Sequence, residues 1–311
     1  MTEPTETPAT SGALARTRAI VFGGGGPVGV AWELGLAAGL AASGVDLTTA
    51  DRVTGTSAGS ITGALLLGGD DLAGLVHSVE AMFATGTGAT GADDVPAAAL
   101  AEFMEMALNG STGDAASLSA HRSEVGRFAL AATTISEDAF VGTIGSVLGG
   151  RAWPTGFACT AIDTADGELR VWEESSGVPL ERAVASSCSV PGVYPPVTIN
   201  GSRYMDGGVR SALNADLAAG HDSVIVVSVT LLELPPGIDD PRIDAFLGTQ
   251  RAEIEALRSA GASVEVIVPD LEFLMLSGFG MSLMDFDLVG AAAEAGVRLG
   301  KSEAERIKAA W

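Results

Sequence analysis

The chain has 311 residues, of which 47% are hydrophobic and only 5% aromatic, so a sizeable core must be mostly aliphatic. Acidic residues outnumber basic ones by 39 to 17, which gives a formal net charge of −22. This balance excludes nucleic acid as a partner class and polybasic docking on anionic lipid, because few cations are available to neutralise phosphates. The two cysteines, Cys159 and Cys188, are too few for a disulfide framework or a zinc site. We expect buried free thiols and a cytoplasmic protein.

Hydrophobic patterning divides the chain into a tail and one domain. Residues 1–16 are rich in Thr, Pro and Glu without periodicity, which predicts a disordered N-terminal tail before a domain over 17–311. Apolar runs that do not alternate, separated by helical patterns, predict an α/β fold in three layers, with a mostly parallel central sheet and helices on both faces. Strands are predicted at 18–22, 51–54, 156–162, 168–172, 197–199, 223–230 and 264–268, and helices at 27–42, 58–68, 71–84, 96–108, 122–132, 136–148, 179–186, 210–219, 242–260 and 287–309.

Two glycine-rich elements near the N-terminus carry the strongest functional signal. Residues 23–29 read GGGGPVG directly after an apolar run, and residues 55–59 read GTSAG between a predicted strand and a predicted helix. A strand, a sharp turn with Ser57 and then a helix is the context in which G-x-S-x-G exposes a nucleophilic hydroxyl. The upstream glycines would place backbone N–H groups near a developing oxyanion. The alternative, that Ser57 merely caps the following helix, stays open at this point.

A serine nucleophile needs a base, and the sequence offers two kinds. The three histidines are His77, His121 and His221, and their positions near predicted helices and helix ends favour surface roles. A triad of Ser57, Asp206 and His221 has the chain order of α/β-hydrolases. Alternatively, Asp206 is itself the base, since it ends a short extended segment and is followed by two glycines that allow close approach. An aspartate bonding its own turn is the third interpretation.

Taken together, these motifs resemble the patatin-like phospholipase family. That family has a glycine-rich loop near the N-terminus, G-x-S-x-G about 30 residues later, and D-G-G or D-G-A well downstream. This chain has residues 24–29, 55–59 and 206–208 in that order, and the stretch 185–197 also resembles the family sequence before the aspartate. The resemblance covers about residues 18–230.

The resemblance implies a three-layer patatin-like fold and a serine acyl hydrolase with a Ser-Asp dyad and no catalytic histidine. Ser57 would be the nucleophile and Asp206 its base, and backbone N–H groups of the loop would form the oxyanion hole, at Gly24, Gly25 and Gly26. No metal or cofactor is implied. One departure concerns Val28, where members of the family often carry Arg or Lys, and it bears on head-group preference rather than on the backbone donors.

A dinucleotide-binding protein is the main rival from another class. Residues 24–29 also satisfy G-x-G-x-x-G between a strand and a helix, with Asp46 or Asp51 as the acid about 20 residues on. That interpretation leaves the turn at Ser57 and the motif at Asp206 unexplained.

The expected substrate is a lipid or fatty-acyl ester, with transient contact to a membrane surface and no nucleic acid. An acyl chain needs an apolar channel, and residues 85–120 and 270–286 are the candidate segments to line or cover it. The second segment is rich in Met, Leu and Phe, which suit irregular apolar ligands. Ordinary core packing is the alternative for these residues.

Overall fold

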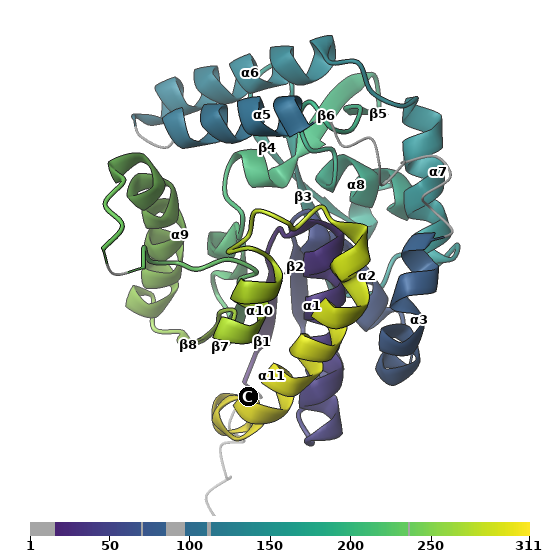
Figure 1. Ribbon diagram of the computed structural model, residues 1–311, viewed down its shortest axis with the longest axis vertical. Coiled ribbons are helices and arrows are strands. Elements are labelled where there is room, and N and C mark those ends of the chain that lie inside the picture. Colours follow the sequence, from purple (N-terminus) through teal and green to yellow (C-terminus); the bar gives the residue numbers. More distant parts are fainter. Residues whose placement is uncertain (1–15, 70, 85–96, 111–112, 236) are drawn as a thin grey trace, which may run out of the picture.

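The computed structural model describes residues 16–69, 71–84, 97–110, 113–235 and 237–311. The predicted disordered tail therefore lies outside the described residues except for its last position. The described strands form one eight-stranded sheet in the order β5-β6-β3-β2-β1-β7-β8, with β4 also paired to β3 (Figure 1). The strands are β1 (Arg18–Phe22), β2 (Arg52–Gly55), β3 (Phe157–Asp163), β4 (Leu169–Glu173), β5 (Val197–Ile199), β6 (Ser202–Asp206), β7 (Ser223–Val227) and β8 (Ser263–Ile267).

Most of the sheet is parallel. Strands β3, β2, β1, β7 and β8 run in one direction, whereas β4 and β6 are antiparallel to β3 and β5 is antiparallel to β6. Parallel strands buried on both faces are expected to be continuously apolar. Strand β1 fits this rule, because Ile20 and Phe22 face one buried cluster while Ala19 and Val21 face another.

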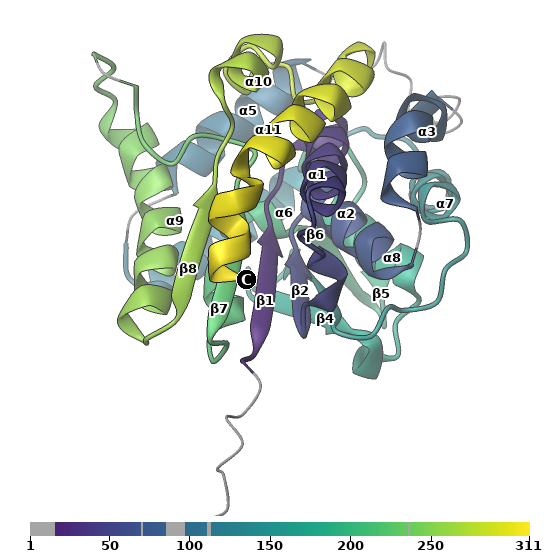
Figure 2. The same cartoon turned by 90° about the horizontal axis from the view of Figure 1, so that it is seen from below.

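Helices cover both faces, which confirms the predicted three layers. Helices α1 and α11 lie side by side on one face with α2, and α9 packs on the other face (Figure 2). A Cβ at Gly35 of α1 would lie 2.1 Å from the Ala293 carbonyl oxygen of α11, so glycine lets these two helices approach closely. The helices are α1 (Gly26–Ala42), α2 (Ala58–Leu67), α3 (Leu72–Ala84), α5 (Ala97–Asn109), α6 (Ala115–Ala131), α7 (Glu137–Leu148), α8 (Leu180–Ser187), α9 (Pro241–Ser259), α10 (Leu271–Leu276) and α11 (Val289–Ala310).

Several sequence predictions differ from the structure. The helix predicted at 210–219 is wrong, since this region contains only a short 3-10 turn at Ala215–Ala218, and another such turn, Gly207–Val209, ends just before it. Helix α6 begins at Ala115 rather than 122, because Asp114 caps it by accepting a hydrogen bond from Ser117 N. Helix α10 was not predicted, and strand β6 was predicted only as a short extended segment that ends at Asp206.

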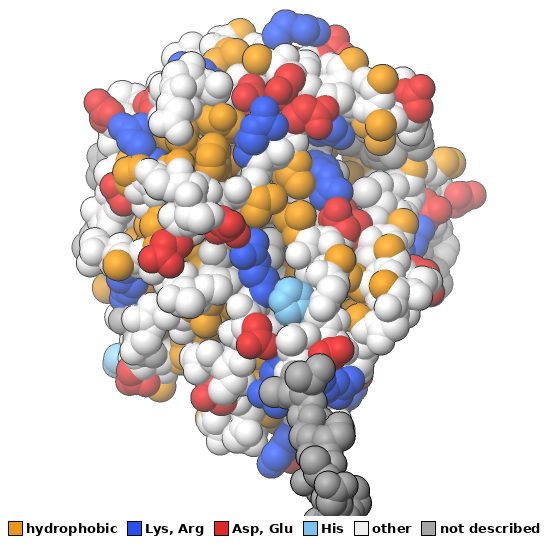
Figure 3. All heavy atoms as spheres, turned by 180° about the vertical axis from the view of Figure 1, so that it is seen from behind, with side chains coloured by type: hydrophobic (Ala, Val, Ile, Leu, Met, Phe, Trp, Pro, Cys, Tyr) orange, Lys and Arg blue, Asp and Glu red, His pale blue; other side chains and the backbone are white. Residues whose placement is uncertain are grey.

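The distribution of surface charge and the hydrophobicity of the helices both bear on what the protein could bind. On the face seen from behind, acidic and basic side chains lie intermingled with apolar ones rather than in a patch of one sign (Figure 3). Among the helices of the described residues, none has both the length and the apolar character needed to cross a membrane.

Candidate active site

The glycine-rich loop joins β1 to α1 at the carboxyl edge of the parallel strands. Gly23 N donates to Val227 O at 3.0 Å, and Gly24 N donates to Ala212 O at 2.8 Å, so both N–H groups are engaged within the fold. Within the described part of the chain, the N–H groups of Gly25 and Gly26 have no acceptor. These two N–H groups begin helix α1, where unpaired donors and the helix dipole favour an anion.

Glycine is required in this loop for two different reasons. Gly26 has φ +58°, a left-handed conformation that glycine adopts easily. Gly25 has an extended φ of −174°, which residues with a side chain also adopt. What excludes a side chain there is space, because a Cβ at Gly25 would lie 2.5 Å from Val229 Cγ1. Val28 is fully buried, so the residue at this position contributes packing rather than charge.

Ser57 lies in a strained turn between β2 and α2. Its φ of 53° and ψ of −117° are unusual for a residue with a side chain, and such strain is concentrated at functional sites. A Cβ at Gly55 would lie 2.2 Å from Gly59 O, so both flanking glycines are needed for the turn to close. Ser57 stands at the N-cap position of α2, but its side chain makes no capping hydrogen bond, which leaves the hydroxyl available.

Asp206 is the last residue of β6 and its carboxyl group is buried beside Ser57. Oδ1 accepts a hydrogen bond from Gly208 N at 2.7 Å, while no hydrogen bond of ordinary geometry reaches Oδ2 from the described residues. Burial raises the pKa of Asp206 from 3.8 to about 7, and the Gly208 N–H and the Ser57 hydroxyl lower that pKa in part. The Ser57 hydroxyl is therefore close enough to interact with the carboxylate, whose Oδ2 remains open to receive a proton.

The stretch 185–197 supports both residues from one side. Ser57 N donates to Ser187 Oγ at 3.0 Å, and Asp206 N donates to Ser189 O at 3.0 Å. Cys188, between these serines, donates from Sγ to Ser57 O at 3.3 Å. Cys188 and Cys159 are buried free thiols, as predicted, and burial raises the pKa of both. A short segment thus holds the backbone of Ser57 and of Asp206 in fixed relation.

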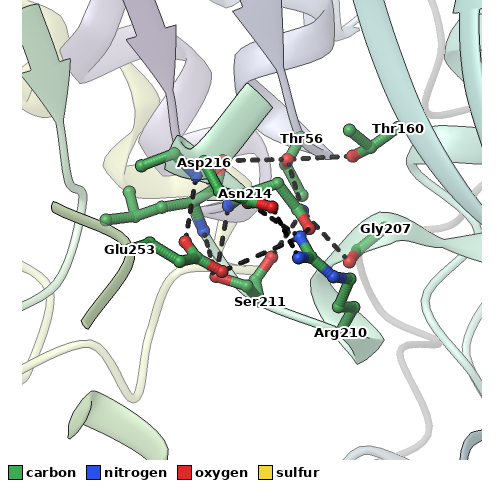
Figure 4. A network of polar contacts seen from close by, with 10 residues as sticks. Thr56, Thr160, Gly207, Arg210, Ser211, Asn214, Asp216 and Glu253 are labelled. Atoms are coloured by element: carbon green, nitrogen blue, oxygen red, sulfur yellow. Dashed lines mark hydrogen bonds and ion pairs between the residues drawn. The ribbon is translucent and has the colours of Figure 1, made fainter. Parts of the chain in front are cut away.

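A buried polar network supports the same two residues from the other side (Figure 4). Asn214 Nδ2 donates to Thr56 Oγ1 at 3.0 Å and to Gly207 O at 3.3 Å. Thr56 precedes Ser57 and Gly207 follows Asp206, so one amide bridges the neighbours of both. Asn214 Oδ1 in turn accepts from Arg210 Nη1 at 2.7 Å.

Glu253 anchors this network from α9. Its Oε2 accepts hydrogen bonds from Ser211 Oγ at 3.0 Å and from Ala215 N at 2.9 Å. Burial raises the pKa of Glu253 to about 7. The turns on both sides of Asn214 are thereby tied to the helix that covers the sheet.

An apolar cavity opens beside Ser57. Its volume is about 70 Å³. Its lining joins the glycine loop, the start of α2, helix α7 and the end of the 270–286 segment. The main apolar lining residues away from Ser57 are Phe83, Phe140, Ile144, Val147, Met284 and Phe286.

The two predicted channel segments differ in outcome. Met284 and Phe286 belong to the 270–286 segment and line the cavity. Of the segment 85–120, residues 85–96 and 111–112 lie outside the described residues, and the described remainder does not line the cavity. Helix α7 supplies that wall instead. Sequence reasoning missed this role because the apolar face of α7 reads as ordinary core.

The histidines and the acids of the rival interpretations lie elsewhere. His221 precedes β7, at the edge of the sheet opposite the carboxyl ends, and its Nδ1 bonds Ala218 O. His121 bonds Met106 O and His77 is exposed on α3. Asp46 and Asp51 both precede β2, whereas a bound dinucleotide would lie beyond the carboxyl ends of the strands. The structure therefore does not bring together all the residues that a triad or a dinucleotide site would require.

Within the described residues, no group of three or more His, Cys, Asp or Glu side chains has an arrangement that would hold a metal ion. The candidate site consists of Ser57, Asp206, the N–H groups of Gly25 and Gly26, and the apolar cavity. Asn214 and Ser187 are supporting residues that the sequence did not single out, although Asn214 stands only eight positions after Asp206.

Comparison with known proteins places the chain in a family. The model of the patatin-like phospholipase family matches residues 20–219. Among solved structures, VipD from Legionella pneumophila matches with a TM-score of 0.42 and 14% identity, over 88% of this chain and 67% of VipD. The type III effector protein ExoU matches with a TM-score of 0.37 and 14% identity, over 92% of this chain and 53% of ExoU. No match was found among curated protein sequences. On the family match, which spans most of the chain and its motifs, the chain belongs to the patatin-like phospholipase family and is a lipid ester hydrolase.

Proposed function

We propose that the chain cleaves lipid esters through a Ser57–Asp206 dyad and an acyl-enzyme intermediate. Asp206 Oδ2 takes the proton of the Ser57 hydroxyl as Oγ attacks the carbonyl carbon of the ester. The oxyanion that forms accepts hydrogen bonds from the N–H groups of Gly25 and Gly26. Asp206 then returns the proton to the departing alcohol, and the acyl group remains on Ser57.

Water completes the cycle through the same groups. Asp206 takes a proton from the attacking water, the second oxyanion occupies the same donors, and the proton returns to Ser57 Oγ as the fatty acid leaves. Gly24 has a positioning role in this scheme, because its N–H is engaged with Ala212 O and so holds the loop rather than the oxyanion.

The observation that carries the proposal is the pairing of an uncapped serine hydroxyl with a buried carboxylate of raised pKa. A general base works best when its pKa lies near the operating pH. The pKa of Asp206, about 7, meets this condition without a histidine.

The apolar cavity supports an acyl chain as the part of the substrate that lies beside Ser57. Residues 17–311 act in this proposal as one acyl hydrolase domain. The region after the family match contributes α11, which packs on α1, and the cavity residues Met284 and Phe286.

Labelling with a fluorophosphonate probe tests the nucleophile. The wild-type protein should label and should hydrolyse p-nitrophenyl butyrate, whereas Ser57→Ala should do neither while its circular dichroism spectrum is unchanged. Ser146, which is exposed on α7, gives the matched control: Ser146→Ala should label like the wild type. His221→Ala should keep most of its activity. Turnover retained in Ser57→Ala would rule out this mechanism, and loss of activity in His221→Ala would favour the triad.

A further inference from the structure

Exposed large apolar side chains gather in one short segment after β8. Of the eight such side chains exposed in the described residues, five lie between positions 268 and 281. Four of them form what we call the apolar ridge: Leu271 is 68% exposed, Met275 66%, Phe279 59% and Met281 85%. Exposed apolar side chains that cluster in one segment indicate an interaction site more than isolated ones do.

The ridge is held in place rather than frayed. Leu271 and Met275 are four residues apart on α10 and so share one face of that helix. Phe273, between them, is fully buried and its ring centroid lies 5.0 Å from that of Trp32. Glu272 bonds Arg298 of α11 at 2.5 Å. The anchored faces of α10 therefore fix Leu271 and Met275 toward solvent.

Phe279 is presented to solvent by a strained backbone. Its φ is 57°, a left-handed conformation that is a genuine outlier for an aromatic residue. The flanking Gly278 and Gly280 also have positive φ, and Phe279 N donates to Leu274 O at 2.7 Å. An Asn or Gly would adopt this turn more easily, so an exposed phenylalanine here indicates a use for its ring.

The ridge runs directly into the wall of the active site. Leu283 O accepts a hydrogen bond from Val28 N at 3.2 Å, which joins the segment to the start of α1 next to the glycine loop. Met284 and Phe286 follow immediately and line the cavity beside Ser57. In Figure 2, α10 lies at the end of the molecule to which the arrows of β1, β7 and β8 point. The ridge and the cavity therefore belong to the same edge of the molecule.

The charges around the ridge select among lipid surfaces. Residues 268–288 contain no lysine or arginine and four acids, at Asp270, Glu272, Asp285 and Asp287, of which Glu272 is paired with Arg298 of α11. The whole chain carries a net charge of −22. An anionic surface would repel this segment, whereas a surface without net charge would accept its apolar side chains.

We infer that the apolar ridge is the surface by which the protein adsorbs to uncharged or zwitterionic lipid, with the cavity mouth turned toward that lipid. This inference rests on the proposed function, because adsorption places ester groups next to Ser57. Leu271, Met275, Phe279 and Met281 insert among the outer parts of the lipid, and the acids beside them stay in water.

Vesicle flotation of the full chain tests the inference. It is carried out in a Ser57→Ala background, so that lipid binding is read without hydrolysis and does not depend on which residue is the nucleophile. The ridge variant combines Phe279→Asn, which suits the left-handed backbone, with Met281→Ser. The control combines Met104→Ser with Leu130→Ser, two apolar residues that are 46% and 47% exposed on α5 and α6.

The parent protein should bind phosphatidylcholine vesicles, and adding phosphatidylglycerol should weaken binding at low salt. The ridge variant should bind phosphatidylcholine at least tenfold more weakly than the parent. The control variant should bind as tightly as the parent. A second ridge variant, Leu271→Ser with Met275→Ser, should behave like the first and covers the case in which one variant misfolds. With Ser57 restored, the ridge variants should hydrolyse soluble p-nitrophenyl butyrate like the wild type but phosphatidylcholine vesicles more slowly.

Several outcomes would overturn the inference. One is unchanged vesicle binding in both ridge variants when they are folded. Another is a loss of vesicle binding in the control variant equal to that in the ridge variants. A third is tighter binding of the parent to anionic vesicles than to phosphatidylcholine vesicles. A dimer in solution that dissociates only in the ridge variants would make a second copy of the chain the occupant instead. Loss of ester hydrolysis in every protein tested, with vesicle binding as described, would contradict the proposed function and leave the adsorption surface standing.

Discussion

Replacing Asp206 by asparagine should abolish activity and at the same time stabilise the fold. The carboxylate is buried, and its pKa of about 7 lies roughly three above the ordinary value of 3.8. That difference corresponds to about 4 kcal/mol of destabilisation when the group is charged in the folded protein, as an order of magnitude. Asparagine is similar in shape, keeps an oxygen for the Gly208 N–H, and carries no charge to bury.

The direction of the stability change and the pH range in which it occurs follow from the linkage between folding and proton binding at Asp206. Between pH 3.8 and 7 the folded state binds more protons at Asp206 than the unfolded state does, so this group lowers the free energy of unfolding as pH rises. The destabilisation is absent well below pH 3.8 and complete above pH 7. The gain in stability of Asp206→Asn over wild type should therefore grow by about 2 kcal/mol from pH 5.5 to pH 8.5, since about half of the full effect is already present at pH 5.5.

Urea denaturation of both proteins at these two pH values measures the difference. The lower value stays above the sequence pI of 4.3, where an acidic protein would lose solubility. Asp239→Asn, an exposed change, controls for the removal of one negative charge. Hydrolysis by Asp206→Asn should fall by about 10²–10⁴-fold, the usual contribution of a general base. A stability gain that does not increase with pH, or turnover near the wild-type rate, would refute the reasoning.

Three further predictions concern the surroundings of the dyad. Asn214→Gly keeps the left-handed backbone but removes the side-chain bridge between Thr56 and Gly207. For a short ester, kcat should therefore fall about tenfold while KM changes little. As a control, Asn200→Gly at an exposed left-handed position should leave kcat unchanged. Gly25→Ala should reduce kcat by about 10²-fold because its Cβ would strike Val229 and misplace an oxyanion donor, and adding Val229→Ala should restore part of the rate. Val147→Phe should shift the preference of p-nitrophenyl esters toward shorter acyl chains, because it fills the cavity from α7; an unchanged chain-length profile would exclude this cavity as the acyl site.

Local sequence signals were sufficient where one short segment determines the conformation. The strand, turn and helix around Ser57 were predicted within about one residue, because the glycines at 55 and 59 allow only a tight turn there. The Asp-Gly-Gly motif likewise predicted Asp206 at the end of an extended segment. The patatin-like resemblance, which depends on the order of these motifs, was confirmed by the family match.

Long-range contacts explain what the sequence did not predict. Residues 210–219 have helical spacing, but Asn214 adopts a left-handed conformation and is bound to Thr56, just after β2, which interrupts a continuous helix. Helix α10 is only six residues long and carries no strong periodic signal of its own. The cavity wall from α7 depends on where that helix packs, which no pattern within it reveals.

The burial of Asp206 bears on why the proposed dyad would suffice for this chemistry. An aspartate with a pKa of about 4 is too weak a base to draw a proton from a serine hydroxyl effectively near neutral pH. At Asp206, burial destabilises the fold but also raises the pKa of the carboxyl group to about 7. At neutral pH a fraction of this group is therefore ionised, and the carboxylate is a stronger base than an ordinary aspartate. The engaged oxygen Oδ1 fixes the orientation, while Oδ2 stays free to accept the proton. A histidine supplies this basicity in a triad. In the proposed dyad a buried carboxylate, held between the 185–197 stretch and the Asn214 network, would supply it instead.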